Sequence, residues 1–353
     1  MKFALLNDTH CGIRNSSDIF LDNAEKFYED VFFPHLLEND IKHIVHLGDY
    51  YDNRKFINFR ALNRNRNHFL KKLREYGITM DIFVGNHDTY YKNTNNLNSL
   101  KELFGHYTDV VNIIHEPTEM QYGDVTFAMI PWINSENEKQ TMEFLKNTKA
   151  THVGGHFDII GFEMLKGIES THGLDAAVFE RFQAVYTGHY HVKSSKNNIH
   201  YLGSQMEFFW SDAHNDKYFH IFDTETQELT KIRNPHTLFH RIHYDDTNYN
   251  YLEYDFSLVE NKFVKIVVIN KSDVFTFDRF VDKIQSCKIH ELKIQENFNE
   301  FVGEKVDDET ILLEDTTSLL NSYIDGVDTE LDKDRIKLQM HDLMTEAQTL
   351  EVA

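Results

Sequence analysis

Five short motifs rich in Asp, Asn and His lie within the first 191 residues of the chain. They read DTH at residues 8–10, GDYYD at 48–52, GNHD at 85–88, GH at 155–156 and GHYH at 188–191. Each motif alone is weak evidence, because a lone Asp-x-His or Gly-His pair is more often a turn or a hydrogen-bonded histidine. Their joint occurrence predicts that the five motifs contribute side chains to one site.

The motifs supply seven oxygen and nitrogen donors and no thiolate. The carboxylates are Asp8 and Asp49, the amide is Asn86, and the imidazoles are His10, His156, His189 and His191. This donor set suits manganese, iron or magnesium better than a structural zinc. Two divalent cations about 3.5–4 Å apart, bridged by one carboxylate, would clamp a phosphoryl group and activate a water molecule. In an extended segment His189 and His191 point the same way, so each can reach a different cation.

The sequence around the motifs predicts a layered α/β domain. Short apolar runs typical of buried strands alternate with longer stretches of helical spacing, such as residues 19–37 and 97–104. The motifs follow strand candidates, and strand ends in an α/β sheet face a common crevice. Later strand-like segments predict a mixed or antiparallel second sheet; they are residues 199–202, 218–222, 229–232 and 238–244.

Composition limits the classes of protein. The 353 residues leave room for about two domains with a packed core. The formal net charge of −21 excludes nucleic-acid binding through bulk charge, so a polyanion would need a local basic patch, metal ions or a partner. Two cysteines, Cys11 and Cys287, exclude a disulfide scaffold. Neither a signal peptide nor a membrane-spanning run is recognised, so we expect a soluble, cytoplasmic protein.

The expected domain boundaries lie near residues 245 and 300. The first 244 residues carry the motifs, and residues 245–299 form a small strand–helix–strand module. Residues 300–353 contain 15 acidic and 4 basic side chains, a net charge of −11. An apolar stripe over residues 334–350 predicts the second helix of a helix–loop–helix. Its terminal position and charge favour docking to a partner, although packing onto the chain's own module is the alternative.

A basic run contrasts with this acidic tail. Residues 54–74 contain eight Arg or Lys and no acid, directly after the second motif. One interpretation is a solvated helix face, and the other is a patch that contacts phosphates. The sequence alone leaves both open.

The five motifs resemble those of the calcineurin-like metallophosphoesterase superfamily: D-x-H, G-D-x-x-D/H, G-N-H-D/E, G-H and G-H-x-H. No ligand is missing. The order of the motifs, the small module and the acidic tail further resemble the SbcD-type nucleases of the double-strand-break repair complex, in particular the short phage-encoded forms. The resemblance implies a two-sheet sandwich flanked by helices, a small α/β cap domain that recognises DNA, and a C-terminal helix–loop–helix.

The resemblance also implies a role for each site residue. The ligands fall into two groups and a bridge: Asp8, His10 and His191 for one metal, Asn86, His156 and His189 for the other, and Asp49 between them. His87 would meet the phosphate as general acid or transition-state stabiliser. Asp52 stands where archaeal and eukaryotic members have His, and we expect it to orient His87. We expect Asp88 to be a structural hydrogen-bonding residue.

The implied activity is that of a metal-dependent DNA exonuclease and endonuclease with two divalent ions, manganese first and magnesium or iron as alternatives. It would act in DNA end processing, recombination and repair, away from membranes, with an SbcC-like coiled-coil ATPase bound by the C-terminal helices. A homodimer is also implied, and its candidate face, or else a part of the monomer core, comprises Leu97, Leu100, Leu103 and Phe104. Two other functions stay open: a small-substrate phosphatase or cyclic-nucleotide phosphodiesterase of the same superfamily, and a scaffold that binds DNA ends without cutting.

Overall fold

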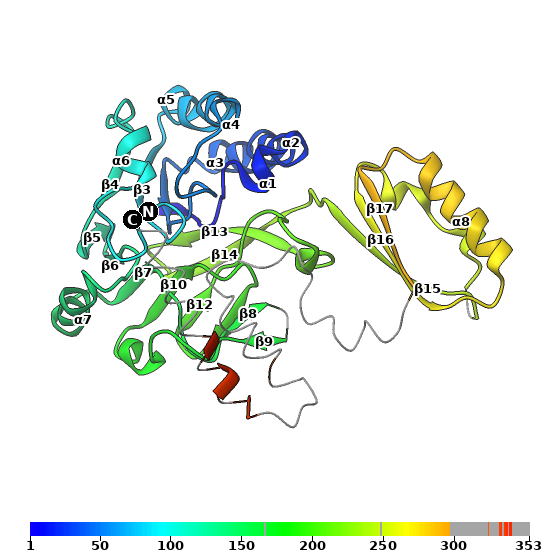
Figure 1. Ribbon diagram of the computed structural model, residues 1–353. Helices are drawn as coiled ribbons and strands as arrows, with labels where there is room; N and C mark the ends of the chain where they lie inside the picture. The colour runs from blue at the N-terminus through cyan, green and yellow to red at the C-terminus, as the bar shows by residue number, and fades with distance from the viewer. Residues whose placement is uncertain are drawn as a thin grey trace. The chain divides into compact units, whose positions relative to one another are not determined.

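The computed structural model describes residues 1–165, 167–247 and 249–296, together with residues 324, 332–333, 335–337 and 339–340 of the C-terminal region. The chain divides into two compact units. The first comprises Met1–Phe208 and Asp212–Glu296, and the second comprises Phe209–Ser211 and Asn297–Ala353. Two large sheets, one small sheet and one short hairpin make up the β-structure of the first unit (Figure 1).

Both large sheets have six strands and a mostly parallel centre. The first sheet contains, in spatial order, β14 (Glu228–Asn234), β13 (Lys217–Asp223), β1 (Lys2–Leu6), β2 (His43–His46), β3 (Thr79–Phe83) and β4 (Val111–Ile114). The second contains β11 (Ser194–Lys196), β12 (Ile199–Tyr201), β10 (Ala184–Gly188), β7 (His152–His156), β6 (Val125–Ile130) and β5 (Thr118–Tyr122). Strands β1 to β4 are parallel to one another, as are β6, β7, β10 and β12.

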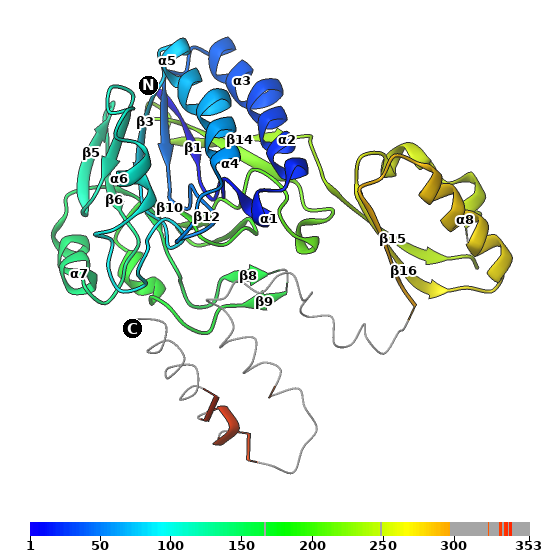
Figure 2. The same cartoon turned by 45° about the horizontal axis from the view of Figure 1, so that its top comes forward.

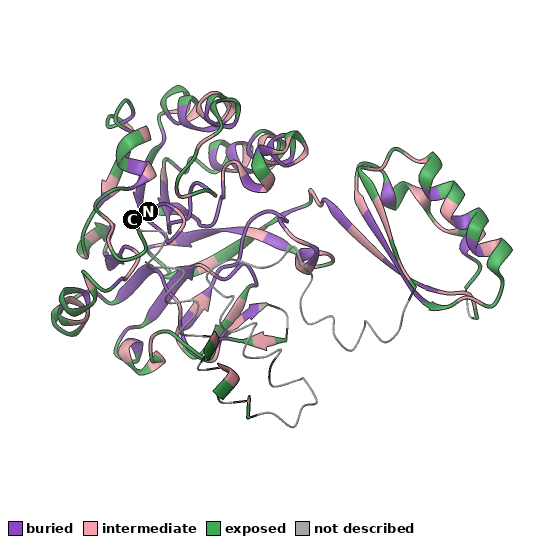
Figure 3. Ribbon diagram, in the orientation of Figure 1, coloured by how far each residue is buried: buried purple, intermediate pink, exposed green. Residues whose placement is uncertain are grey.

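The two sheets bury one core between them. Phe3, Val45 and Phe83 from the first sheet pack in one cluster with Phe127 and Tyr186 from the second. The ring of Phe3 meets that of Phe127 edge-on, with centroids 5.8 Å apart, and lies tilted against that of Phe222, with centroids 5.3 Å apart. Figure 3 shows the buried strands between more exposed outer elements. The predicted two-sheet sandwich is therefore confirmed.

Helices cover the outer face of the first sheet (Figure 2). They are α1 (Ile13–Ser16), α2 (Asp18–Lys26), the π-helical η1 (Phe27–Phe32), α3 (Phe33–Glu38), α4 (Phe59–Asn65), the π-helical η2 (Arg66–Leu70) and α5 (Lys71–Tyr76). The predicted helix over 19–37 is thus a run of α2, η1 and α3. Pro34 lies in the first turn of α3 and has no N–H to donate to the preceding turn. This accounts for the π-helical geometry of η1, which directly precedes α3. Phe32 packs against Phe219 of the sheet, with centroids 5.0 Å apart.

The outer face of the second sheet packs against α7 (Glu138–Asn147), the 3₁₀ turn η3 (Ala176–Phe179) and the hairpin β8 (Glu163–Leu165) with β9 (Ile168–Glu169).

Strand β12 is the single member of the four later predicted strands that joins this sheet. Strand β13 pairs antiparallel with β1, with Phe222 opposite Phe3, and β14 extends the same edge of the first sheet. The fourth strand belongs to the small sheet.

The predicted helix over 97–104 is the short α6 (Ser99–Leu103), capped by the side chain of Asn98. Leu100 and Phe104 are fully buried, and Phe104 contacts the rings of Tyr50 and Tyr51. These two side chains therefore belong to the monomer core and not to a dimer face. Leu97, in contrast, is 39% exposed.

The cap is a small parallel sheet with one helix. Strands β15 (Phe239–Asp245), β16 (Phe263–Asn270) and β17 (Glu291–Gln295) pair in this order, and α8 (Val274–Ser286) packs on them through Phe277, Phe280 and Ile284. Two 3₁₀ turns, η5 (Tyr251–Glu253) and η6 (Phe256–Val259), lie between β15 and β16. Another 3₁₀ turn, η4 (Trp210–Asp212), lies earlier in the chain, outside the cap. The cap sheet begins at Phe239, before the expected boundary at residue 245, because β15 pairs with β16 from Phe239 onward.

The acidic tail is described at few positions. Residues 335–337 and 339–340, within the predicted second helix, are helical. Ile324, which ends the first predicted helix, is also helical and is buried. The other residues of the two predicted helices lie outside the described residues. Among the described residues, no helix is long and apolar enough to cross a membrane.

Much of the basic run is used within the fold. Arg60 pairs with Asp18 at 3.0 Å, and Arg64 pairs with Asp22 at 2.6 Å and also with Glu25. These contacts join α4 to the acidic side of α2. Arg74 pairs with Asp109 at 2.6 Å, and Lys72 pairs with Glu75 at 2.7 Å. Four of the eight basic side chains are thus paired with acids of the same chain. This pairing favours a role of the segment within the fold over a patch that contacts phosphates.

A buried carboxylate connects the sandwich to the cap. Glu207 Oε2 accepts hydrogen bonds from the backbone N–H groups of Leu238 and Phe239, at 2.5 Å and 2.9 Å. Phe239 is the first residue of β15. Burial raises the pKa of Glu207 from 4.5 to about 7, although the two N–H groups favour its charged form. The junction therefore binds a proton more tightly when folded than when unfolded.

We expect the stability that Glu207 contributes to be greatest below about pH 4.5 and to be lost as the pH rises through about 7. Glu207→Gln keeps an acceptor oxygen for both N–H groups and removes the titration. The free energy of unfolding of the variant minus that of the wild type should increase by about 3 kcal/mol across this range. Urea unfolding at several pH values measures it, and a difference that does not change with pH would contradict the assignment.

Candidate metal centre

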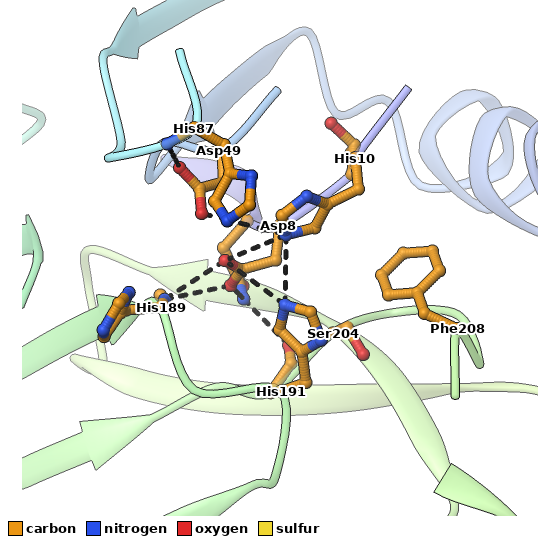
Figure 4. Close-up of polar contacts among 12 residues, drawn as sticks. Asp8, His10, Asp49, His87, His189, His191, Ser204 and Phe208 are labelled. Carbon is orange, nitrogen blue, oxygen red and sulfur yellow. Dashed lines mark hydrogen bonds and ion pairs between the residues drawn. The ribbon is translucent and has the colours of Figure 1, made fainter. Parts of the chain in front are cut away.

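The five motifs occupy the carboxyl ends of parallel strands. The first three follow β1, β2 and β3 of the first sheet, whereas His156 ends β7 and the GHYH motif begins at the end of β10 in the second sheet. Parallel neighbours end at the same edge, so each sheet presents its motifs side by side. Packing of the two sheets then brings the two sets of side chains together (Figure 4).

One cluster consists of Asp8, His10 and His191. Their ligand atoms lie within 4.8 Å of one another. The Nε2 atoms of His10 and His191 are 3.0 Å apart, and Asp8 Oδ1 lies 3.9 Å from the first and 4.0 Å from the second. This is the group that the sequence analysis expected to hold one cation.

The second cluster surrounds the side-chain oxygen of Asn86. Asn86 Oδ1 lies 2.9 Å from His156 Nε2 and 3.0 Å from His189 Nδ1. The other nitrogen of His156, Nδ1, donates to the carbonyl oxygen of Leu47 at 2.8 Å. That bond fixes the tautomer and leaves Nε2 directed at the cluster, as in many histidine metal ligands.

Asp49 lies between the two clusters. Its Oδ2 is 3.2 Å from His156 Nε2 and 3.8 Å from His10 Nε2. Its Oδ1 accepts the backbone N–H of His87 at 2.8 Å. All seven donors predicted from the sequence are therefore brought together, with Asp49 in the bridging place.

The backbone is unusual where it carries these ligands. Asp8, His10, Asp49 and His189 all have positive φ values, between 42° and 89°, a region that is costly for side chains with a Cβ. The neighbouring glycines allow the close approach of the loops. A Cβ on Gly85 would lie 2.1 Å from Asp49 Oδ1, so the glycine of the GNHD motif is a steric requirement for the position of Asp49.

The electrostatics of the cluster fit cations. Burial raises the pKa of Asp8, whereas His156 and His87 hold the pKa of Asp49 well below its usual value against the effect of burial. Burial also opposes charge on His10 and His156, yet the surrounding carboxylates raise both pKa values to about 9. Burial, in contrast, holds the pKa values of His189 and His191 well below the ordinary value, so these two imidazoles stay neutral donors. Oxygen and imidazole donors of this kind can hold two divalent cations.

His87 lies beside the first cluster and is no member of the predicted ligand set. Its ring meets that of His10 edge-on, with centroids 4.8 Å apart. His87 Nδ1 donates to the backbone carbonyl of Asp52 at 2.6 Å, and burial lowers the pKa of the ring. The carboxylate of Asp52 faces His10 Nδ1 at 3.4 Å. Asp52 therefore contacts His87 through its backbone carbonyl and not through its carboxylate. Residue type could not predict this contact, because every residue has a backbone carbonyl.

Asp88 connects the second and third motifs. Its carboxylate accepts the backbone N–H groups of Tyr50, Tyr51 and Gly85 at 2.9–3.2 Å. Burial and the nearby charge of Asp49 raise its pKa to about 6. This matches the structural role expected from the sequence.

Two aromatic side chains that the sequence analysis did not single out flank the donors. Trp132, two residues after β6, lies against His156 and His189, with centroids 5.9 Å and 5.4 Å apart. Phe208 meets His10 and His191 edge-on at 5.6 Å and 5.5 Å. The position of Trp132 after a strand end was a usable signal. Phe208 has no such signal, because it lies in a loop remote from the motifs.

Three comparisons with known proteins show what the chain is similar to. The chain is 28% identical over 340 residues to "Exonuclease subunit 1" of Enterobacteria phage T4, and the match covers 95% of each chain. A solved structure described as a novel archaeal phosphodiesterase matches 66% of this chain and 100% of its own, with 14% identity and a TM-score of 0.33. The sequence model of calcineurin-like phosphoesterases matches residues 1–193. That stretch is more than half of the chain and includes every donor of the two clusters, so the chain belongs to the calcineurin-like phosphoesterase family.

Proposed function

We propose that this phosphoesterase is the nuclease subunit of a DNA-processing complex, with exonuclease and endonuclease activity in DNA end processing, recombination and repair. The observation that carries the proposal is the similarity to the phage T4 exonuclease subunit over 95% of both chains. That similarity includes the cap and tail, which a small-substrate phosphatase or cyclic-nucleotide phosphodiesterase would not need. The two free cysteines suit a reducing compartment, and we infer action in the cytoplasm, of the host if a phage encodes the chain.

The family uses divalent metal ions, and we propose two manganese ions at the two clusters. Asp8, His10 and His191 would hold one ion, Asn86, His156 and His189 the other, and Asp49 would contact both. When bound, two such ions neutralise the charge of the phosphate and activate water as the nucleophile. The protein's own contribution is a buried, preorganised set of donors that orients the phosphate for attack.

His87 is proposed to act on the phosphate without binding metal. Its Nδ1–H is already donated to the carbonyl of Asp52, so Nε2 is the ring atom left for the substrate. A proton can pass from Nε2 to the leaving oxygen only when both ring nitrogens are protonated. Burial lowers the pKa of His87, and the carboxylate of Asp49 opposes this effect and so favours the charged form.

We expect manganese-dependent hydrolysis of linear double-stranded DNA, with p-nitrophenyl phosphate tested beside it. His87→Ala should lower turnover by about 100-fold or more and keep both ions, because it removes a group that meets the phosphate and no ligand. Asp49→Ala should lose both metal and activity. Nuclease assays with elemental analysis of the same samples decide this. Efficient cleavage of the small ester without cleavage of DNA would favour the phosphatase alternative, and loss of metal in His87→Ala would overturn its role.

A homodimer is a second part of the proposal. Phe56 precedes α4 and Phe59 is its first residue, and their side chains are 77% and 84% exposed. Exposure of two neighbouring large apolar side chains to water is unfavourable in a monomer. We propose that a second copy of the chain covers them, since the basic residues around them on α4 are already paired within the monomer.

Light scattering should give twice the monomer mass of 41.8 kDa for the wild type. Phe56→Ser with Phe59→Ser should shift the mass to that of the monomer, because the contact loses its apolar side chains. Leu258→Ser, at a 48% exposed position in the cap, is the matched control and should stay dimeric. A monomeric wild type at micromolar concentration would contradict this proposal.

The partner is proposed to be an SbcC-like coiled-coil ATPase that binds the acidic tail. Within the predicted stripe, Ile336 and Met340 are half-buried and helical, whereas the neighbouring Gln339 is exposed. An apolar helix face of this kind fits a groove between the helices of a coiled coil.

Ile336→Glu with Met340→Glu should abolish co-purification with the ATPase and leave the manganese-dependent nuclease activity unchanged, because the stripe contributes none of the seven proposed metal ligands. Gln339→Glu, which adds charge on the exposed side, should bind normally. Pull-down and nuclease assays on the same preparations test this. A chain shortened to end at Asn299 should behave like the double variant, and an insoluble or metal-free product would show that the tail belongs to the fold.

A further inference from the structure

A buried lysine lies behind the first cluster. Lys217, the first residue of β13, has a side chain only 3% exposed, and its partner Asp212 has one only 2% exposed. Removing two charges from water is expensive, and such a pair is usually no more stabilising than apolar side chains of the same size. A buried ion pair at this place therefore calls for a reason other than stability.

The ammonium group of Lys217 makes three hydrogen bonds. Nζ donates to Asp212 Oδ1 at 2.5 Å, to Ser204 Oγ at 3.0 Å and to the backbone carbonyl of His191 at 3.1 Å. The last bond reaches the main chain of a donor of the first cluster. The N–H of Ser204 donates to the same carbonyl at 3.2 Å, so the backbone of His191 is fixed from two directions.

Asp212 extends the contact to the other side of the same imidazole. Its Oδ2 accepts the backbone N–H of Phe208 at 2.8 Å, while Arg14 Nε donates to the carbonyl of Phe208 at 3.2 Å. The ring of Phe208 then meets His191 and His10 edge-on. Figure 4 shows Ser204 and Phe208 beside His191. One ion pair thus holds both the backbone of His191 and the ring that packs against its side chain.

We propose that Lys217, with Asp212, is a positioning residue for His191 and therefore sets the affinity of the first cation site but not of the second. The proposal rests on the proposed two-metal centre. The second cluster is held by other groups. His156 Nδ1 donates to the carbonyl of Leu47, and the imidazoles of His156 and His189 lie against Asn86 Oδ1 and the ring of Trp132. Strand β13 keeps seven paired residues with β14 and four with β1, so the sheet does not need the ammonium group.

The decisive variant is Lys217→Met with Asp212→Leu, which removes both charges and keeps apolar volume in the buried site. Lys217→Met alone would leave Asp212 as an unpaired buried charge and would mix a stability cost with the positioning effect. Lys265→Met is the matched control, because Lys265 is also a buried lysine but lies on β16 of the cap. His191→Ala is the positive control, in which the first site is lost.

Manganese binding to the full chain is measured by titration calorimetry and by electron paramagnetic resonance, with thermal unfolding recorded in parallel. The double variant should keep a thermal midpoint near that of the wild type, bind one ion with unchanged affinity and bind the other about 10- to 100-fold more weakly. The resonance of two coupled ions should give way to that of a single ion at intermediate manganese concentration. Lys265→Met should bind both ions like the wild type.

Three results would overturn the proposal. They are equal affinity for both ions in the double variant and the wild type, equal weakening of both sites, and a double variant that does not fold, which would make the pair a requirement of the fold. Phe208→Leu keeps the ion pair and removes the ring, and it should weaken the same single site by a smaller factor. A wild type that binds fewer than two ions would instead refute the proposed two-metal function, so the two failures are distinguishable.

Discussion

The position of the Asp49 carboxylate is the constraint around which the site is built. Its two oxygens lie close to groups from three other strands: the N–H of His87 after β3, the imidazole of His156 at the end of β7, and the imidazole of His10 after β1. These strands belong to both sheets. The carboxylate can occupy this position only if the sheets pack face to face with their motif-bearing ends at one edge. The apolar core that includes Phe3, Phe83 and Phe127 supplies the free energy for that packing.

The site itself opposes folding. Buried carboxylates and imidazoles lose hydration, and four ligand residues have a backbone conformation that side chains disfavour. The surrounding structure compensates through directed hydrogen bonds. Asp88 holds the backbone of the second and third motifs, Leu47 orients His156, and Lys217 holds the backbone of His191. The contacts of Leu47 and Lys217 fix a ligand through its second ring nitrogen or its main chain, and those of Asp88 fix the backbone next to Asp49 and Asn86. The donor atoms directed at the clusters therefore stay free for cations.

The segment over residues 204–208 contacts two parts of the first unit. Phe208 faces the first cluster, whereas the neighbouring Glu207 binds the N–H groups at the start of the cap. Adjacent residues of one loop therefore contact the metal ligands and the cap. If the cap recognises DNA, as the family resemblance implies, this segment would be a short physical path between the cap and the proposed metal ligands.

The sequence by itself determined which residues make the site. Strand-end motifs such as DTH and GHYH identify donors by residue type and spacing, and an α/β pattern places strand ends together, so all seven donors and a layered α/β domain could be predicted. The two-sheet sandwich was implied by the family resemblance. The tertiary structure alone decided how those donors are held. Phe208 lies in a loop, Asp212 in a 3₁₀ turn and Lys217 at the start of β13, and none of the three positions carries a local signal in the sequence. The backbone carbonyl of Asp52, rather than its side chain, accepts the hydrogen bond from His87 Nδ1–H. Packing partners distant in sequence likewise decided three further features: the burial of Leu100 and Phe104, the pairing of the basic run with α2, and the start of the cap at Phe239. An apolar or charged pattern indicates that a face must be covered, but it does not identify the element that covers it.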